Sequence, residues 1–241
     1  MNRILKILIT VCISVLSCGL PNFIHLEEPY VNSVSPLINL EGEYTNNPNN
    51  DKNYFIGHHL YYKIYTSELA LDTGVRQIES TTLDATKYMI SHGYTALQEP
   101  VTTIVSEEAT VLHKMPLVAI PSAMRNSTFD VQLNFEEILM GDEKNYESYI
   151  KIDALNKTIP IARYVRQNRI DSKSNEFLVK NFCYKSFNKN DSDIPKGFKD
   201  HGSLYMAVFV VSLGADNNKS ILKSEPTYIG KFQIDIDYFA D

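Results

Sequence analysis

The sequence has 241 residues, of which 29 are acidic and 23 are basic, so its formal net charge is −6. This acidic surplus and the lack of a lysine- or arginine-rich block argue against nucleic acid as a partner, because phosphate groups would be repelled. The length is enough for one large domain or two small ones with a sizeable buried core.

The N-terminus carries the pattern of an export signal. Arg3 and Lys6 precede an apolar run, Ile7–Leu16, that is too short for a permanent membrane-spanning helix. The run ends in Val-Leu-Ser-Cys at 15–18, which resembles a bacterial lipobox, although valine stands where leucine is usual. The resemblance implies that residues 1–17 are a lipoprotein signal peptide and that Cys18 is acylated and becomes the new N-terminus. A secretory signal cut elsewhere and an uncleaved anchor are the alternatives.

Acylation of Cys18 would make membrane lipid a partner of the protein. A single acyl chain binds only reversibly, since each buried CH₂ contributes roughly 0.8 kcal/mol, whereas two or three chains anchor firmly. Gly19 after the cysteine favours, by analogy with other lipoproteins, the outer membrane of a bacterial cell envelope. Cys12 leaves with the signal and Cys183 remains alone, so we expect no internal disulfide and a buried Cys183.

The chain after the signal begins with irregular and strand-like patterns. Residues 18–28 lack a period and are interpreted as a tether. Pro29–Leu40 contains Pro36 and is typical of an edge or irregular strand, because proline cannot donate to a ladder. The asparagine-rich stretch 46–51 predicts a loop. Tyr54–Tyr65, rich in aromatic and β-branched residues, is the clearest predicted strand.

One helix is predicted, at about 79–92. Leu83, Thr86, Met89 and Ile90 recur at three- and four-residue steps, and Gly93 suits the position after a helix end.

Short apolar runs separated by turn residues follow, with the spacing of an all-β sandwich. The near-continuous run within Ser203–Ser212 predicts a central strand buried on both faces, followed by a hairpin loop at 214–218. Lys189–Gly202 is interpreted as a long exposed loop. The runs are Leu117–Pro121, Phe129–Phe135, Tyr149–Ile152, Ile159–Val165, Leu204–Leu213 and Tyr228–Ile236.

Three segments resemble strands of an immunoglobulin or fibronectin type III sandwich. Leu60–Tyr65 is similar to a C-type strand, Tyr205–Leu213 to an F-type strand, and Ser-Glu-Pro at 224–226 to the start of strand G. The resemblance implies a mainly β fold, an immunoglobulin/fibronectin III-like antiparallel sandwich with one inserted helix. Far more residues separate the C-like and F-like strands than in that family. The domain is therefore assigned to 29–241, with a large insertion at about 66–200 as an alternative.

The tyrosine-rich strands and asparagine- and lysine-rich loops are also similar to surface lipoproteins of spirochaete-type bacteria. That resemblance implies no catalytic residues.

Histidine and cysteine spacings do not predict a metal site. Neighbouring His58 and His59 point to opposite faces of a strand, and no H-x-H, H-E-x-x-H or C-x-x-C pattern occurs. We therefore expect no cofactor and no metal, and histidines that cap loops or lie exposed. The remaining candidates are His92, His113 and His201.

Acidic pairs are interpreted as solvated faces. Asp191 and Asp193 lack the glycine and closing glutamate of an EF-hand, which leaves calcium as the alternative there. Asp235-x-Asp237 alternates with isoleucine as on the wet side of a strand, and Glu136-Glu137 is a third pair. No nucleophile elbow or phosphate loop is present.

The sequence thus favours a non-enzymatic envelope lipoprotein that presents loops for protein or glycan binding. A tethered periplasmic hydrolase using His58 or His59 with a carboxylate, and a structural subunit of an envelope complex, are the alternatives. The candidate binding residues are Asn46, Asn49, Asp51, Asp191 and Asp193, and the lipidation site is Cys18.

Overall fold

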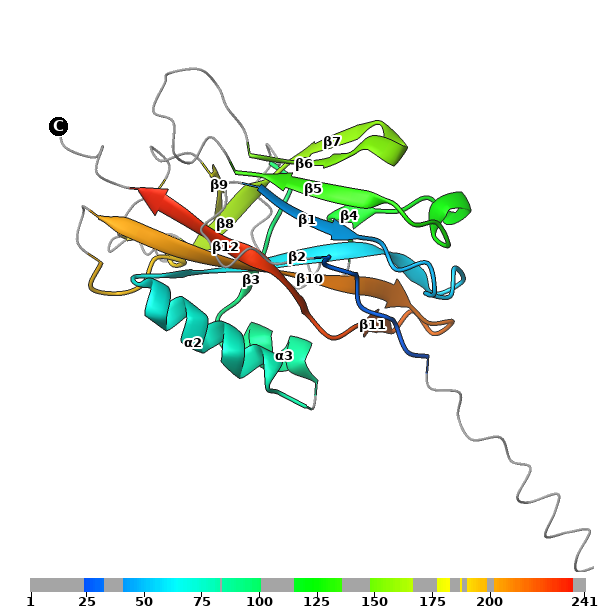
Figure 1. Cartoon of the computed structure of the whole chain (residues 1–241), viewed down its shortest axis with the longest axis horizontal. Helices are drawn as coiled ribbons and strands as arrows, with labels where there is room; N and C mark the ends of the chain where they lie inside the picture. Colours follow the sequence, from blue (N-terminus) through cyan, green and yellow to red (C-terminus); the bar gives the residue numbers. More distant parts are fainter. Residues whose placement is uncertain are drawn as a thin grey trace, which may run out of the picture.

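The residues that the structure describes fold into two antiparallel sheets, a separate two-stranded hairpin and two α-helices (Figure 1). The computed structural model describes residues 24–32, 41–82, 84–100, 115–135, 148–166, 177–182, 187, 190–198 and 202–235. The mainly β, antiparallel prediction is confirmed. The elements are β1 (Glu41–Thr45), β2 (Phe55–Tyr65), α2 (Glu68–Glu79), α3 (Ala85–Ser91), β3 (Thr95–Ala96), β4 (Val118–Ala119), η1 (Ser122–Met124), β5 (Asp130–Asn134), β6 (Tyr149–Ile152), η3 (Asp153–Leu155), β7 (Lys157–Pro160), β8 (Ala162–Arg166), β9 (Phe177–Asn181), β10 (Ser203–Ala215), β11 (Ile221–Lys223) and β12 (Thr227–Asp235).

The two sheets and the helices form three layers. Sheet A has the order β1-β5-β6-β7, and sheet B has the order β11-β10-β2-β3, with β12 beside β10 and β4 beside β2. Figure 1 shows sheet A above sheet B and the two helices below sheet B. A separate hairpin, β8-β9, is joined to the rest by backbone hydrogen bonds between Ala162 and Gln98. Residues 66–200, the alternative insertion, supply both helices and β5, β6 and β7 of sheet A.

β2 and β10 lie at the centre because both of their faces are buried. Leu204, Met206 and Val208 belong to the core between the sheets, whereas Ala207 and Phe209 belong to a second core between sheet B and the helices. Side chains alternate between the two faces of a strand, so a strand covered on both faces needs a continuous apolar run. The predicted central strand in 203–212 is confirmed.

The prediction of a single helix at 79–92 is wrong. The described residues contain two α-helices, of which α3 lies inside the predicted range and α2 before it, and Asp84 is the N-cap of α3 in the left-handed region (φ 48°). Helix α2 begins at the N-cap Ser67, whose side chain accepts from Ala70 N, and it buries Leu71, Val75 and Ile78. Leu83 lies outside the described residues.

Gly74 lies inside α2 and makes the helix hard to predict from sequence, because glycine in a helix interior normally weakens the helix. Here a Cβ at position 74 would lie 2.3 Å from the Tyr65 hydroxyl oxygen of β2. The glycine therefore allows the helix to pack closely on sheet B. Lys231 of β12 adds an ion pair with Glu68 at the start of the helix.

The N-terminal segment 24–32 packs on the body of the domain. Leu26 is buried, and the buried amide of Asn50 bonds both to Glu27 N (2.8 Å) and to Glu27 O (3.0 Å). Asn47 donates to Glu28 O at 2.9 Å. Part of the expected tether thus belongs to the folded domain, held by the asparagine-rich loop.

Gly57 of β2 gives the first testable prediction. A Cβ there would lie 2.1 Å from the Val118 carbonyl oxygen of β4, and the backbone has a positive φ (154°). We expect Gly57→Ala to lower the free energy of unfolding by about 2–4 kcal/mol, since overpacking and backbone strain add. Urea unfolding followed by circular dichroism measures the change.

The matched control is Gly197→Ala, where φ is also positive (86°) but nothing lies within 4 Å of an added Cβ. This control carries only the conformational cost of the left-handed region. Equal destabilisation by the two variants would contradict the proposed clash with β4.

Candidate functional site

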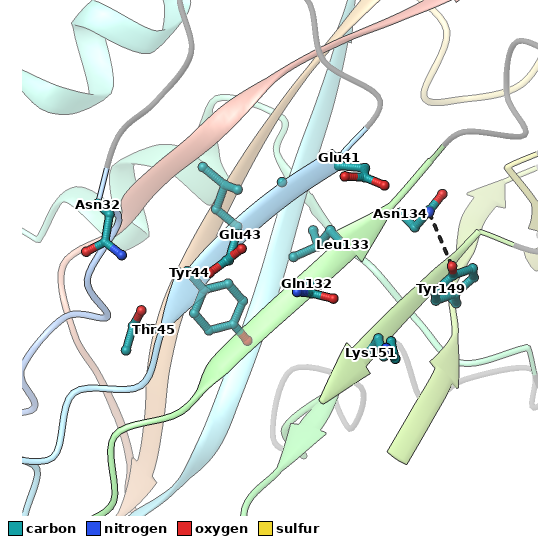
Figure 2. A pocket seen from close by; sticks show the side chains of 12 residues that line it. Asn32, Glu41, Glu43, Tyr44, Thr45, Gln132, Leu133, Asn134, Tyr149 and Lys151 are labelled. Carbon is teal, nitrogen blue, oxygen red and sulfur yellow. Dashed lines mark hydrogen bonds between the residues drawn. The ribbon is translucent and has the colours of Figure 1, made fainter. Parts of the chain in front are cut away.

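A cavity of about 560 Å³ lies over β1, β5 and β6 of sheet A. Figure 2 shows two rows of polar side chains crossing these strands. Glu43, Gln132 and Lys151 are paired across the strands in one row, and Glu41, Asn134 and Tyr149 in the other. The lining residues are Asn32, Glu41, Gly42, Glu43, Tyr44, Thr45, Gln132, Leu133, Asn134, Tyr149, Lys151 and Ile229.

The two-residue period of the strands decides which side chains reach this cavity. Tyr44, Leu133 and Ile150 are buried at 1, 0 and 0 % exposure and face sheet B. The residues between them point to the opposite face. Glu41, Glu43 and Gln132 are exposed there. The outer face of sheet A is therefore polar, while its inner face forms the core.

The cavity side chains offer both hydrogen-bond donors and acceptors. Asn134 Nδ2 donates to the Tyr149 hydroxyl at 3.2 Å, which orients the amide and the phenol toward one another. Lys151 forms a 2.9 Å ion pair with Asp153 at the exposed end of its row. Surface pairs of this kind exchange readily with solvent or ligand. The arrangement can bind a polar molecule, and it contains no nucleophile activated by a base.

An aromatic side chain adjoins the cavity. Tyr30 is bonded to Thr45 through both backbone hydrogen bonds of a bridge (2.9 and 2.7 Å), so the two side chains share a face. Tyr30 is 46 % exposed, and its hydroxyl accepts from Asn49 Nδ2 at 3.4 Å. Asn32, two residues further, lines the cavity itself.

The predicted loop residues are separated by the structure. Asn46 is buried and donates to Ser127 O at 2.7 Å. Asn49 and Asp51 are exposed, and Asp51 accepts from Asn53 N at 2.9 Å to shape the turn. Asn49 contacts Tyr30, which pairs with Thr45 of the cavity lining. None of the three predicted loop residues lines the cavity.

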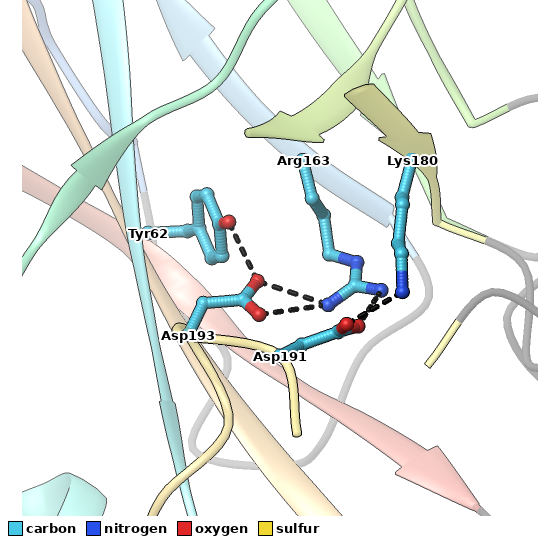
Figure 3. A network of polar contacts seen from close by, with 5 residues as sticks. All are labelled: Tyr62, Arg163, Lys180, Asp191 and Asp193. Carbon is cyan, nitrogen blue, oxygen red and sulfur yellow. Dashed lines mark hydrogen bonds and ion pairs between the residues drawn. The ribbon is translucent and has the colours of Figure 1, made fainter. Parts of the chain in front are cut away.

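The prediction that 189–202 is an exposed loop is correct only in part: residues 190–198 form no helix or strand, and Asn190, Ser192, Lys196 and Gly197 are exposed, but Asp191 and Ile194 are buried. Asp191 and Asp193 turn inward to a fully buried arginine, Arg163 of β8 (Figure 3). Arg163 Nη1 lies 3.0 and 2.9 Å from the two Asp193 carboxylate oxygens, and Nη2 lies 3.1 Å from Asp191. Lys180 of β9 completes the network at 2.5 Å from Asp191. A calcium ion would have to displace these cations.

Tyr62 joins the network to the central strand. Its hydroxyl donates to Asp193 at 2.7 Å, and burial, followed by the Asp193 carboxylate, raises the pKa of the phenol well above its ordinary value. The phenol therefore remains protonated and keeps donating. The Arg163 guanidinium also lies 3.7 Å from the centre of the Phe187 ring, a cation–π contact. The network ties the hairpin and the 190–198 segment to sheet B.

The buried network gives a second prediction. Asp193→Asn preserves the shape but removes one of the two charges that face Arg163, and we expect a loss of about 2–4 kcal/mol in unfolding free energy. Urea unfolding measures the change. Lys151→Ala, which breaks the exposed pair with Asp153, is the matched control and should leave the midpoint unchanged. Similar effects of both variants would contradict a stabilising buried network.

The two neighbouring histidines point to opposite faces, as predicted, but the expectation that they lie exposed is wrong. His58 and His59 are 0 and 1 % exposed. His58 Nδ1 lies 3.2 Å from the Tyr44 hydroxyl, and among the described residues His58 Nε2 has no hydrogen-bond partner. His59 lies beside Tyr61, which belongs to the core between sheet B and the helices. His92 is exposed at the end of α3, in line with the expectation.

His58 gives a prediction about pH. Burial lowers the pKa of its imidazole to about 3, whereas in an unfolded chain the pKa is about 6.5. Between these values the unfolded state binds a proton that the folded state does not, so stability falls as pH falls below about 6.5. We expect wild type to lose about 1.4 kcal/mol per pH unit more than His58→Gln between pH 6 and 4.

Urea midpoints of the two proteins at pH 7, 6, 5 and 4 test this linkage. Above pH 6.5 the difference between them should be constant, because His58 is then neutral in both states. A difference that also stays constant down to pH 4 would contradict the buried neutral imidazole.

Other sequence candidates do not form a centre in the part of the chain that the structure covers. Within the described ranges no three His, Cys, Asp or Glu side chains are grouped to hold a metal ion. No helix among them is long and apolar enough to cross a bilayer. The remaining candidates lie outside the described residues: Cys18, Cys183, His113, His201, Glu136, Glu137 and Asp237.

Comparisons of the chain with family models, with curated proteins and with solved structures found no match.

Sequence reasoning missed the cavity residues although it predicted two of their three strands, β5 and β6. The signal was the alternation itself, in which Gln132 and Asn134 flank Leu133, and Tyr149 and Lys151 flank Ile150. The cavity emerges only when three strands are placed in register, because each strand contributes two side chains.

Proposed function

We propose that this chain is a non-enzymatic envelope lipoprotein, anchored through an acylated Cys18, whose β domain binds a protein or a glycan. The observation that carries the binding proposal is the polar cavity on the outer face of sheet A. Membrane lipid is the proposed partner of the anchor, and the outer membrane is the proposed location. Sites that recognise ligands commonly lie on surfaces that a rigid scaffold positions but does not use for its own packing.

Sheet A supplies such a surface. Its inner side chains already make the core with sheet B, so the outer side chains are not needed to hold the layers together. Two polar residues on each of three neighbouring strands converge on one cavity (Figure 2). A cavity of about 560 Å³ falls within the usual range for small-ligand sites.

The alternatives draw less support from the described residues. A hydrolase site would need a histidine near a carboxylate in a pocket. His58 instead meets Tyr44 in the core, and His59 meets Tyr61. A structural subunit would be expected to show a contiguous apolar patch. Among the residues that the structure describes, three large apolar side chains are markedly exposed, and they lie far apart in the sequence: Tyr30, Leu69 of α2 and Met115.

We also propose the immunoglobulin or fibronectin III-like relationship for the central strands. In support, the C-like β2 pairs with the F-like β10, and β10 pairs with β12, which follows the Ser-Glu-Pro element at 224–226. All of these pairs are antiparallel, as in the CFG sheet of such domains. The four-stranded sheet A would then correspond to the second sheet.

Metabolic labelling with palmitate tests the anchor. We expect label in wild type and in Cys12→Ala, whose substitution lies in the segment that is removed, but none in Cys18→Ala. Membrane fractionation of the same strains should find wild type with the outer membrane and the Cys18 variant released. Equal labelling of wild type and Cys18→Ala would overturn the lipoprotein proposal.

A further inference from the structure

The outer face of sheet A has the chemistry of a carbohydrate-binding surface. Its cavity is lined by amides (Asn32, Gln132 and Asn134), a phenol (Tyr149), two carboxylates and one ammonium group, Lys151. Amides and phenols both donate and accept hydrogen bonds, which is what each sugar hydroxyl requires of its partner. Neighbouring strands lie about 4.8 Å apart, so the two rows repeat these groups at a regular interval.

Tyr30 adds a second, independent feature. It is an aromatic ring left 46 % exposed, and its backbone pairs with Thr45, which lines the cavity. Its hydroxyl contact with Asn49 restrains the ring, which is the rigid amphipathic platform that stacks on the C–H face of a sugar. From Tyr30 across β1 and β5 to β6 is three strand intervals, about 14 Å. The surface is therefore longer than one sugar ring.

We propose that this surface binds an extended neutral oligosaccharide, stacked on Tyr30 and hydrogen-bonded by Gln132, Asn134 and Tyr149. This inference rests on the proposed function, of which it names the ligand class. The lining holds two exposed carboxylates, Glu41 and Glu43, and one cation, Lys151, which is already paired with Asp153, so repulsion disfavours phosphorylated or sulfated ligands.

A protein partner fits this surface less well. Protein interfaces depend on apolar or aromatic anchors buried at the centre of the contact. The apolar side chains in the cavity lining, Tyr44, Leu133 and Ile229, are 1, 0 and 3 % exposed, so they are already used in the core. The centre of the surface is the Glu43, Gln132 and Lys151 row. Polar groups at the centre and one aromatic ring at the margin suit a saccharide.

Saturation-transfer NMR and calorimetry with the full protein in detergent micelles test the proposal. The probes are maltotetraose, cellotetraose and tetra-N-acetylchitotetraose, which separate plain hexose chains from the amide-bearing chains typical of a cell wall. We expect at least one to bind. Tyr30→Ala should weaken that binding about tenfold or more, and Tyr30→Phe should retain it, since the ring is what stacks.

Gln132→Ala and Asn134→Ala should each weaken binding about three- to tenfold through a lost hydrogen bond. Lys157→Ala, exposed on β7 and outside the cavity lining, is the matched control and should bind as wild type does. Circular dichroism of every variant confirms the fold. Binding that the Tyr30, Gln132 and Asn134 substitutions leave unchanged would overturn the proposed surface.

Two further outcomes would overturn the saccharide proposal but not the proposed function. One is that none of the three saccharides binds while palmitate labelling and outer-membrane fractionation succeed. The other is cross-linking from position 132 to a protein partner in intact cells, which would assign the surface to protein recognition. If Cys18 is not labelled but a saccharide still binds, the proposed lipid anchor is overturned and the proposed binding surface stands.

Discussion

The antiparallel pairing of β2 with β10 is the constraint on which the other elements depend. The pair runs from Tyr205 opposite Tyr65 to Gly214 opposite Phe55, and both of its faces are covered. Apolar burial on two faces stabilises by roughly 25 cal/mol per Å² of apolar surface, so this pair contributes twice what a one-sided strand would. The helices cover one face and sheet A covers the other, as Figure 1 shows. The two apolar faces of the β2–β10 pair thus determine where sheet A and the helices pack.

A strand buried on both faces has no solvent-exposed face for its polar side chains. β2 nevertheless carries His58 and Tyr62 toward the core between the sheets. Tyr62 is satisfied by Asp193, whose charge is in turn balanced by Arg163. A buried polar group without such partners would cost several kcal/mol. The ion network therefore has two roles. It satisfies the buried Tyr62 hydroxyl of the central strand, and it holds the β8-β9 hairpin against sheet B.

The apolar patterns of the sequence predicted the two long central strands, β2 and β10. Tyr54–Tyr65 and Leu204–Leu213 were recognisable because burial on two faces leaves a long apolar and aromatic run. Helix α2 was missed because Gly74 satisfies a tertiary contact with Tyr65 at the expense of helix propensity. Ser80–Asp84 was included in a helix because the apolar spacing continued across it.

Contacts between residues far apart in the sequence also explain why the candidate site could not be predicted. Asp191 and Asp193 were assigned to a solvated loop because their partners are distant in sequence, 30 residues for Arg163 and 131 for Tyr62. No local pattern distinguishes a buried carboxylate that is paired from an exposed one. The cavity residues were likewise invisible as a group, since β1 and β5 meet in register only after a long excursion of the chain.

Under the proposed function, the inner face of sheet A serves stability and its outer face serves recognition. Along β1, Gly42 and Tyr44 face inward, and a Cβ at Gly42 would lie 2.8 Å from Ile229 of sheet B, so this face tolerates little change. Glu41 and Glu43 alternate with them and face the cavity. Surface substitutions away from packing usually alter stability by less than about 0.5 kcal/mol. The outer residues are therefore free to change with the ligand while the layers stay in place, which is the property expected of a recognition surface.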